Sequence, residues 1–444
     1  MKINRFHTYG IAIAICMLCP VPANSSDQVP APPQKQPIAL VGGIIHTVSG
    51  DVIEGGTVVF NKGKLVDVGT TVVIPSNALR VDIAGKHVYP GLIETVSQLG
   101  LAEIDAVRAT LDYYELGSIN PNVRAEKAVN PDSERIPVTR SNGIALAVSM
   151  PRGGLLSGQS ALMMLDGWTW EDMTLKAPVG MVIDWPQIPV TKAYGKQQSK
   201  DSQREQIQKR LDELEKTFRE ARAYKTAREA AGNKGVPFQK TDVRWESLIP
   251  VLDGKLPVWI LANSIQEIET AVEWADRQKI RMVLVGGADA PQASELLKRK
   301  GIPIVVTPIL RLPSRRDSDY DEQYTVPLRL YEAGIPFCIA GGSSMGNERN
   351  LPYHAAMAAA FGLPKDITLK SVTLFAARIL GVDDRVGSIE KGKDATLIVT
   401  DGDPLEITTH VEMMYIQGRN VDLNNRQKML YAKYREKYRQ LGGK

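Results

Sequence analysis

Residues 89–101 read YPGLIETVSQLGL, and the Pro90-Gly91 pair in this stretch marks the boundary between two sequence patterns. Before it, residues 38–89 hold short β-rich runs with hairpin signals such as Asn61-Lys62-Gly63. After it, residues 90–385 hold apolar runs that alternate with helical stretches. The pattern of residues 38–89 predicts a small antiparallel sheet. The pattern of residues 90–385 predicts strand–helix units whose parallel strands are buried on both faces.

The apolar runs after Pro90-Gly91 recur often enough to favour a closed (β/α)8 TIM-type barrel over an open sheet. The clearest runs are GIALAVSM (143–150), PVWILAN (257–263), RMVLVGG (281–287), IPIVVTP (302–308) and IPFCIAGG (335–342). Short β-rich runs occur again over residues 386–423. We therefore expect an α/β fold in which a β-sandwich domain, built from both ends of the chain, flanks the barrel. Reactive groups of such a barrel lie where strands end and loops begin.

Four further segments complete the expected organisation. Residues 1–23 have the basic start, short apolar run and small-residue cleavage site of a signal peptide, which predicts a periplasmic or secreted bacterial protein; an uncleaved N-terminal anchor is the alternative. Residues 24–37 are Pro- and Gln-rich and predict a linker. Residues 200–231 predict a long charged helix as an excursion from the barrel, ended by Gly232-Asn233, and residues 424–444 a polar helical tail.

Bulk charge and cysteine content exclude several classes of protein. The formal net charge is +4 for the whole chain and falls to about +2 once the expected leader is removed, so the overall charge makes no electrostatic case for nucleic acid or an anionic membrane. Cys338 would be the only thiol left after the leader, so no internal disulfide is expected. It lies in an apolar run, which predicts a core residue rather than a nucleophile.

Two motifs resemble a known family. PGLIE (90–94) opens the expected first barrel strand, and GSIEKGKDA (387–395) lies in the second part of the β-domain. Together with the split β-domain they resemble the amidohydrolase superfamily, in particular its imidazolonepropionase-like branch, over about residues 38–430. The resemblance implies metal-assisted hydrolysis of non-peptide C–N bonds, with zinc or another divalent metal held at the barrel mouth mainly by histidines.

At each position where the resemblance implies a ligand, this sequence has another residue. The His-x-His slot of the first strand holds Val96-Ser97-Gln98, and the fifth-strand slot reads Leu261-Ala262-Asn263. The sixth-strand slot ends in Asp289 without a histidine, and the eighth reads Gly341-Gly342-Ser343-Ser344. The chain has five histidines, and only His354 falls in the barrel region, where we expect a helix-packing or surface histidine. No metal or other cofactor is therefore predicted, although an oxygen-ligand site for Ca²⁺ or Mg²⁺ is an alternative.

The candidate residues follow from the expected strand ends. Glu94 and Asp289 are the catalytic candidates, for metal-free acid–base chemistry. Residues expected to line the pocket are Gln98, Glu103, Ser157, Gln159, Asn263, Ser343, Ser344 and Arg349. The Gly-rich stretch 151–160 lacks the Gly-Lys-Ser/Thr ending of a nucleotide-binding loop, so we interpret it as a loop at the barrel mouth. Arg349 is equally compatible with a surface position.

Three functions remain open from the sequence. The first is an exported protein that lacks the catalytic metal and serves as a small-molecule binding protein or as the inactive partner of an active paralogue, in a homo- or hetero-oligomer. The second is a hydrolase of C–N bonds in cyclic or small amides with an atypical site. The third is a structural or assembly role. No nucleic-acid partner and no membrane span after removal of the leader are expected.

Overall fold

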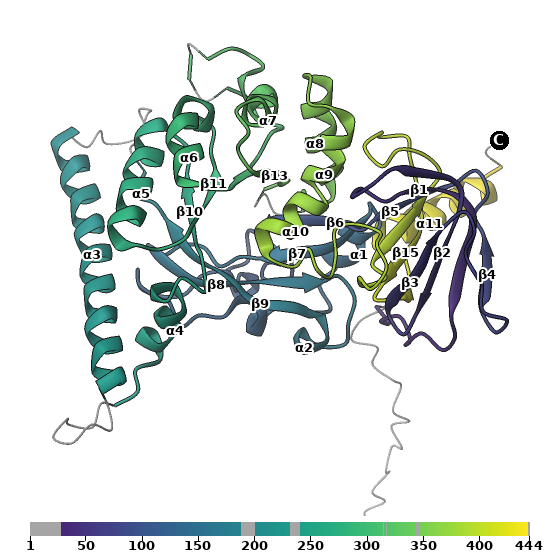
Figure 1. Cartoon of the computed structure of the whole chain (residues 1–444), viewed down its shortest axis with the longest axis horizontal. Helices are drawn as coiled ribbons and strands as arrows, with labels where there is room; N and C mark the ends of the chain where they lie inside the picture. Colours follow the sequence, from purple (N-terminus) through teal and green to yellow (C-terminus); the bar gives the residue numbers. More distant parts are fainter. Residues whose placement is uncertain are drawn as a thin grey trace, which may run out of the picture.

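The computed structural model describes residues 28–187, 200–230, 240–313, 315–316, 318–342 and 346–442. The described chain forms two eight-stranded sheets, one of them built from both ends of the chain (Figure 1). The expected leader lies outside the described residues, as do Gly232-Asn233, Ser343 and Ser344.

The sheet from the chain ends has the strand order β16-β15-β14-β5-β1-β2-β3, with β4 beside β1. Its strands are β1 (Ile38–His46), β2 (Val52–Asn61), β3 (Lys64–Gly69), β4 (Leu79–Asp82), β5 (His87–Pro90), β14 (Leu397–Thr400), β15 (Val411–Ile416) and β16 (Arg419–Val421). The two halves join where β14 pairs antiparallel with β5 and Leu397 lies opposite Pro90. In place of two separate layers, one sheet bends until Phe60 on β2 meets Tyr415 on β15, with ring centroids 4.9 Å apart.

The second sheet is a nearly closed barrel with the order β13-β12-β11-β10-β9-β8-β7-β6. Its strands are β6 (Leu92–Ser97), β7 (Ile144–Ser149), β8 (Leu156–Met164), β9 (Thr174–Asp184), β10 (Val258–Ala262), β11 (Met282–Gly286), β12 (Ile304–Val306) and β13 (Phe337–Ile339). The first and last strands meet through the Thr95 hydroxyl and the Cys338 thiol, 3.6 Å apart. Cys338 is fully buried, and burial raises the pKa of its thiol to about 12, which fits the expected core residue.

The expected barrel of eight parallel strands is right only in its coarse form. Seven strands share one direction, and β8 runs antiparallel to both neighbours, β7 and β9. The connections are the reason, because parallel neighbours need a crossover of about a dozen residues or more. Only residues 150–155 separate β7 from β8, and only residues 165–173 separate β8 from β9.

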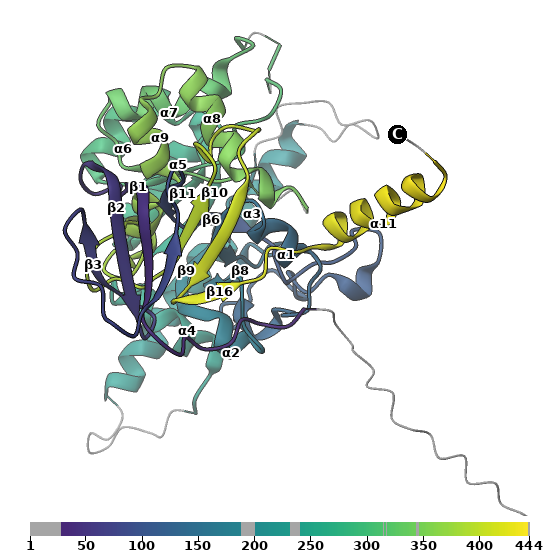
Figure 2. The same ribbon diagram turned by 90° about the vertical axis from the view of Figure 1, so that its right-hand side faces the viewer.

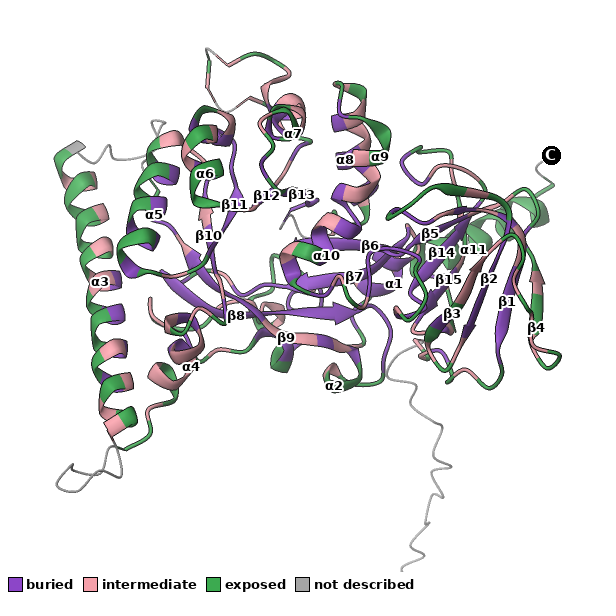
Figure 3. Ribbon diagram, viewed as in Figure 1, coloured by how far each residue is buried: buried purple, intermediate pink, exposed green. Residues whose placement is uncertain are grey.

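Helices cover the outside of the barrel, and its strands are buried (Figure 3). The α-helices are α1 (Arg135–Arg140), α2 (Trp170–Met173), α3 (Lys200–Ala230), α4 (Val243–Leu252), α5 (Ile265–Gln278), α6 (Ser294–Lys300), α7 (Glu322–Glu332), α8 (Leu351–Ala360), α9 (Lys365–Ser371), α10 (Leu374–Leu380) and α11 (Arg426–Gln440). Short 3-10 turns are η1 (Arg108–Thr110), η2 (Ala125–Ala128), η3 (Ala290–Ala293) and η4 (Glu348–Asn350). Among the helices in the described ranges, none combines the length and the apolar character that crossing a bilayer requires.

The long charged helix α3 packs on the barrel through one face. Leu214, Phe218 and Ala221 recur at three- and four-residue steps and are fully buried. The ring of Phe218 meets Trp274 of α5 edge-on, with centroids 5.0 Å apart. The remaining faces of α3 are polar and largely exposed (Figure 3).

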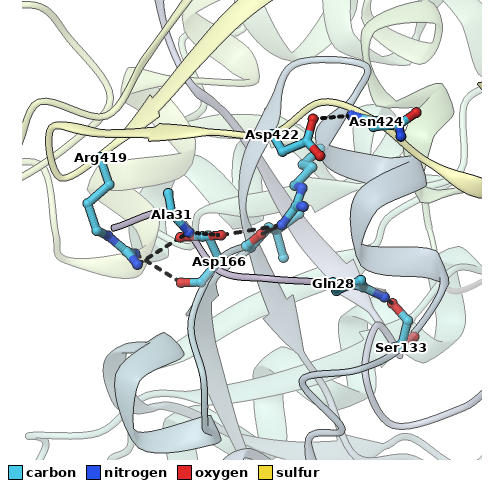
Figure 4. A network of polar contacts seen from close by, with 9 residues as sticks. Gln28, Ala31, Ser133, Asp166, Arg419, Asp422 and Asn424 are labelled. Carbon is cyan, nitrogen blue, oxygen red and sulfur yellow. Dashed lines mark hydrogen bonds and ion pairs between the residues drawn. The ribbon is translucent and has the colours of Figure 1, made fainter. Parts of the chain in front are cut away.

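Within the segment expected to be a linker, Ala31 packs against the protein. The backbone N–H of Ala31 donates to both oxygens of Asp166 at 3.3 Å, and Ala31 is 7% exposed. Asp166 also pairs with Arg140 of α1 and with Arg419 of β16, whose Nη1 lies 2.7 Å from Oδ2 (Figure 4). Asp166, which follows β8, therefore connects the barrel, the other sheet and the N-terminal segment.

Candidate functional site

The carboxyl ends of five neighbouring strands bring small and polar residues to one edge of the barrel. Asn263 follows β10, Gly286 ends β11, Thr307 follows β12, and Gly341 follows shortly after β13. Glu94 of β6 completes the arc, because its Oε2 accepts a hydrogen bond from the Gly341 N–H at 2.8 Å. In a barrel this edge is where ligands and reactive groups meet.

Three glycines of this arc allow polar side chains of the neighbouring strands to approach the backbone closely. A Cβ added to Gly286 would lie 2.6 Å from the Asn263 side-chain oxygen. One added to Gly342 would lie 2.8 Å from the Thr307 hydroxyl, and one added to Gly341 would lie 2.7 Å from Glu94 Oε2. Real Cβ atoms do not approach so closely, so side chains at these glycines would displace the polar groups of the neighbouring strand.

Several polar atoms at the barrel mouth are buried without a hydrogen-bond partner in the described part of the chain. They include Gln98 Nε2, Asn263 Oδ1 and Thr307 Oγ1, which come from three different strand ends. A buried polar group without a partner costs about 1–3 kcal/mol, so native proteins satisfy such groups with protein, water or ligand. The arc therefore offers a donor from Gln98, an acceptor from Asn263 and a hydroxyl that serves as either.

Glu94 is enclosed rather than open to a substrate. It is 0% exposed, Oε1 accepts from the Val96 N–H at 3.0 Å, and Oε2 accepts from Gly341. Burial raises the pKa of Glu94 from its ordinary 4.5 to about 8; the backbone N–H groups of Val96 and Gly341 oppose this rise, and the nearby Glu348 carboxyl adds to it. Burial therefore favours the protonated form of Glu94.

Glu348, in η4, is a second buried carboxyl group beside Glu94. It is 0% exposed, and neither carboxylate oxygen has a partner of hydrogen-bond geometry among the described residues. Burial raises the pKa of Glu348, while backbone amides of η4 and Gly346 and the charges of Arg135 and Arg349 lower it. The Arg135 Nη1 atom is likewise buried without a partner in the described ranges.

The carboxylate of Asp289, a catalytic candidate from the sequence, is hydrogen-bonded to two other segments. Its two oxygens accept from the Arg315 guanidinium at 2.7 and 2.9 Å, and Oδ2 also accepts from the Ile265 N–H at the start of α5. Charge-assisted two-point pairing and helix capping hold the carboxylate in place. Asp289 thus holds Arg315 beside the start of α5, and a catalytic role for it stays a prediction from the sequence.

The residues at the strand ends do not fit the histidine-based metal centre that the resemblance implies. Val96 is 2% exposed and belongs to the same buried apolar cluster as Trp259, Val285 and Ala340. An apolar layer thus fills the position of the first expected ligand. Asn263 and Gln98 offer only amide groups, which are weak ligands for zinc compared with imidazole and thiolate. In the described ranges, no three His, Cys, Asp or Glu side chains gather in a geometry that could hold a metal ion.

The described histidines have other partners. His354 of α8 is buried, and its Nδ1 accepts from the backbone N–H groups of Ile309 and Leu310 at 3.2 and 3.3 Å. Burial lowers the pKa of His354 to about 4, which keeps this acceptor nitrogen neutral, so the expected packing role is confirmed. His46 and His87 lie in the other sheet, with Nε2 and Nδ1 2.9 Å apart.

Four other expected pocket residues do not join the arc. Ser157 and Gln159 lie in strand β8 instead of a loop; the Ser157 hydroxyl bonds to Gly154, and the Gln159 amide donates to the Pro121 carbonyl at 3.0 Å. Glu103 accepts from Asn130, and Arg349 is exposed and donates to the Gly346 carbonyl. The side chains of these four residues are engaged with other parts of the protein, and the exposure of Arg349 agrees with the surface position that was its alternative. Ser343 and Ser344 lie outside the described residues.

The sequence also hides functional candidates that the structure reveals. Thr307 directly follows the apolar run of β12, so the strand-end rule that selected Asn263 could have selected it. Glu348 had no such signal, because it lies in a short turn well beyond β13 and its burial depends on tertiary packing.

Comparison with known proteins agrees with this architecture. The sequence profile of the amidohydrolase family matches residues 262–426. Amidohydrolase tasK of Hapsidospora irregularis is 23% identical over 366 residues, which cover 78% of this chain; the chain spans 37% of the length of that relative. A crystal structure of an amidohydrolase from Thermotoga maritima MSB8 superposes with a TM-score of 0.77 at 25% identity, covering 87% of this chain and 99% of that one.

A more distant structure shares the fold alone. A prolidase in complex with N-methylphosphonate-L-proline is 19% identical, with a TM-score of 0.53 over 87% of this chain and 99% of that one. The mixed α/β fold with a nearly closed eight-stranded barrel sheet is the fold of the amidohydrolases. The family profile, the curated relative and the solved structure all agree in pointing to the amidohydrolase superfamily.

Proposed function

We propose that this protein binds a small polar molecule at the barrel mouth through hydrogen bonds, without the histidine metal centre typical of its superfamily. The observation that carries the proposal is the set of buried, unpartnered atoms Gln98 Nε2, Asn263 Oδ1 and Thr307 Oγ1 within the described residues. A cyclic or small amide offers a carbonyl acceptor and an N–H donor on adjacent atoms. That pattern complements an amide donor and an amide acceptor from two strands.

The site is preorganised for recognition rather than for attack on a bond. The glycines at 286, 341 and 342 let the polar side chains of neighbouring strands approach closely, and Glu94 is held by two backbone N–H groups. We therefore place the protein as a binding protein, or as the inactive partner of an active paralogue in an oligomer. A periplasmic or secreted location is part of the proposal; it rests on the sequence of residues 1–23. Cell fractionation and co-purification from the native envelope test these two points.

One observation favours a second candidate function, a metal-free hydrolase of C–N bonds. The pKa of Glu94 is about 8, close to the value that general acid catalysis near neutral pH requires. The enclosure of Glu94 argues against this candidate, because substrate would have to displace the Val96 and Gly341 amides.

Thermal denaturation with added compounds tests the binding proposal. The probes are cyclic imides, dipeptides and lactones, each followed by calorimetric titration where the melting temperature rises. Gln98→Leu and Asn263→Leu remove the donor and the acceptor at similar size, and Gln266→Leu, at an exposed position of α5, is the matched control. We expect a probe whose stabilisation is lost in the first two variants and kept in the third.

Two results would overturn the proposal. One is stoichiometric bound metal together with turnover of these compounds that depends on Zn²⁺ or Mn²⁺. The other is a ligand response that Gln98→Leu and Asn263→Leu leave unchanged. Metal-independent turnover that Glu94→Gln abolishes would instead establish the second candidate. Strong activity created by Val96→His with Gln98→His would show that the remaining ligands lie elsewhere in the barrel.

A further inference from the structure

The C-terminal helix α11 projects from the body of the protein (Figure 2). Asn425 caps its first turn and donates to the Ser141 hydroxyl at 2.9 Å, which fixes the start of the helix to the barrel. None of the residues 426–440 is buried. An isolated helix of this length is only marginally stable in water. A helix that buries no residue against the protein is therefore a candidate for binding something else.

One face of α11 is apolar and aromatic. At about 100° per residue, Leu430, Tyr431, Tyr434, Tyr438 and the following Leu441 fall within an arc of about 100°, and no charged residue lies inside that arc. These five side chains are 41–71% exposed. Such a pattern is typical of a helix face that packs on an apolar surface, yet none of these side chains is buried against the described chain.

The rest of α11 is strongly basic. It carries six Lys or Arg side chains against one acid, Glu436, which pairs with Arg439. Its net charge of +5 exceeds the +4 of the whole chain. Basic residues border the apolar arc on both sides: Arg435 lies over the Tyr431 ring at 5.6 Å, and Lys437 lies over Tyr434 at 5.9 Å. The charge of the whole chain conceals this local concentration.

We propose that α11 is a membrane-surface helix that lies on an anionic lipid bilayer with its tyrosine face in the headgroup region. Helices of this kind combine an apolar face with a Lys/Arg-rich polar face, and tyrosine favours the interface because its ring is apolar and its hydroxyl is wet. A second copy is a poorer occupant, since antiparallel packing of two α11 helices would bring +5 against +5. A spanning role is excluded by the charges along the helix.

The N-terminal segment lies beside the first turns of α11. A cavity of about 430 Å³ is lined by Gln28 and Val29 together with Met429, Leu430 and Lys433 of α11. The first described residues thus lie beside the helix.

Vesicle flotation tests the proposal on the purified protein with the expected leader, residues 1–23, removed. The vesicles contain phosphatidylcholine alone or with phosphatidylglycerol. The α11 variants are Tyr434→Ala with Tyr438→Ala, and Arg435→Glu with Lys437→Glu. The first matched control is Tyr320→Ala with Tyr331→Ala, at exposed tyrosines outside α11. The charge control is Lys209→Glu with Arg210→Glu, on the exposed face of α3.

Wild-type protein is expected to float with the anionic vesicles and to be released by high salt. Arg435→Glu with Lys437→Glu should weaken binding by about tenfold or more, because each basic residue near the surface contributes about 1 kcal/mol. Tyr434→Ala with Tyr438→Ala should also weaken binding, because it removes two aromatic rings that favour the interface. Both controls should bind like the wild type. Melting temperatures should be unchanged in the α11 variants, since the helix buries nothing, so loss of binding cannot be ascribed to misfolding.

Three results would overturn the proposal. The first is equal flotation with neutral and anionic vesicles, and the second is equal binding by wild type and both α11 variants. The third is an oligomer in analytical ultracentrifugation that the α11 variants dissociate while vesicle binding is absent, which would make a second copy the occupant. The ligand site at the barrel mouth is tested separately, so failure of either idea leaves the other intact.

Discussion

Replacing Glu94 by Gln is expected to destabilise the protein in acid and to stabilise it at alkaline pH. The pKa of Glu94 is about 8 in the folded protein and 4.5 as its ordinary value. Between these values the unfolded chain has lost this proton while the folded chain keeps it, so the folded state binds more protons. The contribution of Glu94 to stability is therefore complete below about pH 4.5, declines as the pH rises, and is constant above about pH 8.

The structure gives the size of both effects. Each pH unit of that window costs about 1.4 kcal/mol, so wild type loses roughly 5 kcal/mol between its two ends. Gln has one acceptor oxygen, so it can satisfy only one of the Val96 and Gly341 N–H groups and presents its NH₂ to the other. A buried donor without an acceptor costs about 1–3 kcal/mol at every pH. The stability curves of wild type and variant should cross at about pH 5–7.

Urea unfolding at a series of pH values, followed by tryptophan fluorescence, measures the crossing. Glu390→Gln is a control of opposite sign: hydrogen bonds from the Ser388 hydroxyl and Lys393 lower the pKa of Glu390 to about 2. The stabilisation from Glu390 is thus present above about pH 4.5 and lost as the pH falls toward 2, so this variant should be less stable than wild type at both neutral and alkaline pH. A Glu94→Gln protein that is less stable by the same amount from pH 5 to pH 9 would refute the reasoning, because it would mean that Glu94 is ionised in the folded state.

Three further predictions concern the barrel and its connections. Gly180→Ala should cost about 1–3 kcal/mol in denaturant unfolding, because its Cβ would lie 2.2 Å from the Trp259 ring, which is fully buried; an unchanged midpoint would contradict the described packing. Asp166→Asn should cost about 3–5 kcal/mol, since it leaves two arginines without their shared counter-charge, and protease cleavage near residue 31 should accelerate. The Cys338 thiol, with a pKa of about 12, should resist a thiol reagent in the folded protein and react at once in denaturant; rapid reaction of the native protein would count against a core position.

Local sequence patterns predicted the parts of this fold that local physics decides. The apolar runs of β7 and β10–β13 became strands, because continuous burial on both faces requires such runs. The absence of histidine at Val96 and Gln98 was visible in the sequence, and the structure adds that Val96 is packed in the barrel interior.

The parts that sequence reasoning missed depend on long-range contacts. The antiparallel course of β8 follows from the lengths of its connections, but stretch 151–160 looked like a loop because glycine and serine interrupt it. The burial of Glu348 and the pairing of Asp289 with Arg315 arise only when segments from separate strand ends meet. The docking of Ala31 on Asp166 depends likewise on residues far apart in the chain.

The pairing of β14 with β5 also constrains the order in which the molecule can be assembled. β5 is made early and β14 late, and the whole barrel lies between them in the chain. Until about the last ninth of the polypeptide is available, β5 carries an open edge that other chains can pair with. The barrel can close during that interval, while the sheet beside it must wait, so the slowest and most aggregation-sensitive step is expected to be the final insertion of β14. A chain that stops before residue 397 would therefore retain the strands of its barrel and still leave a permanently exposed strand edge.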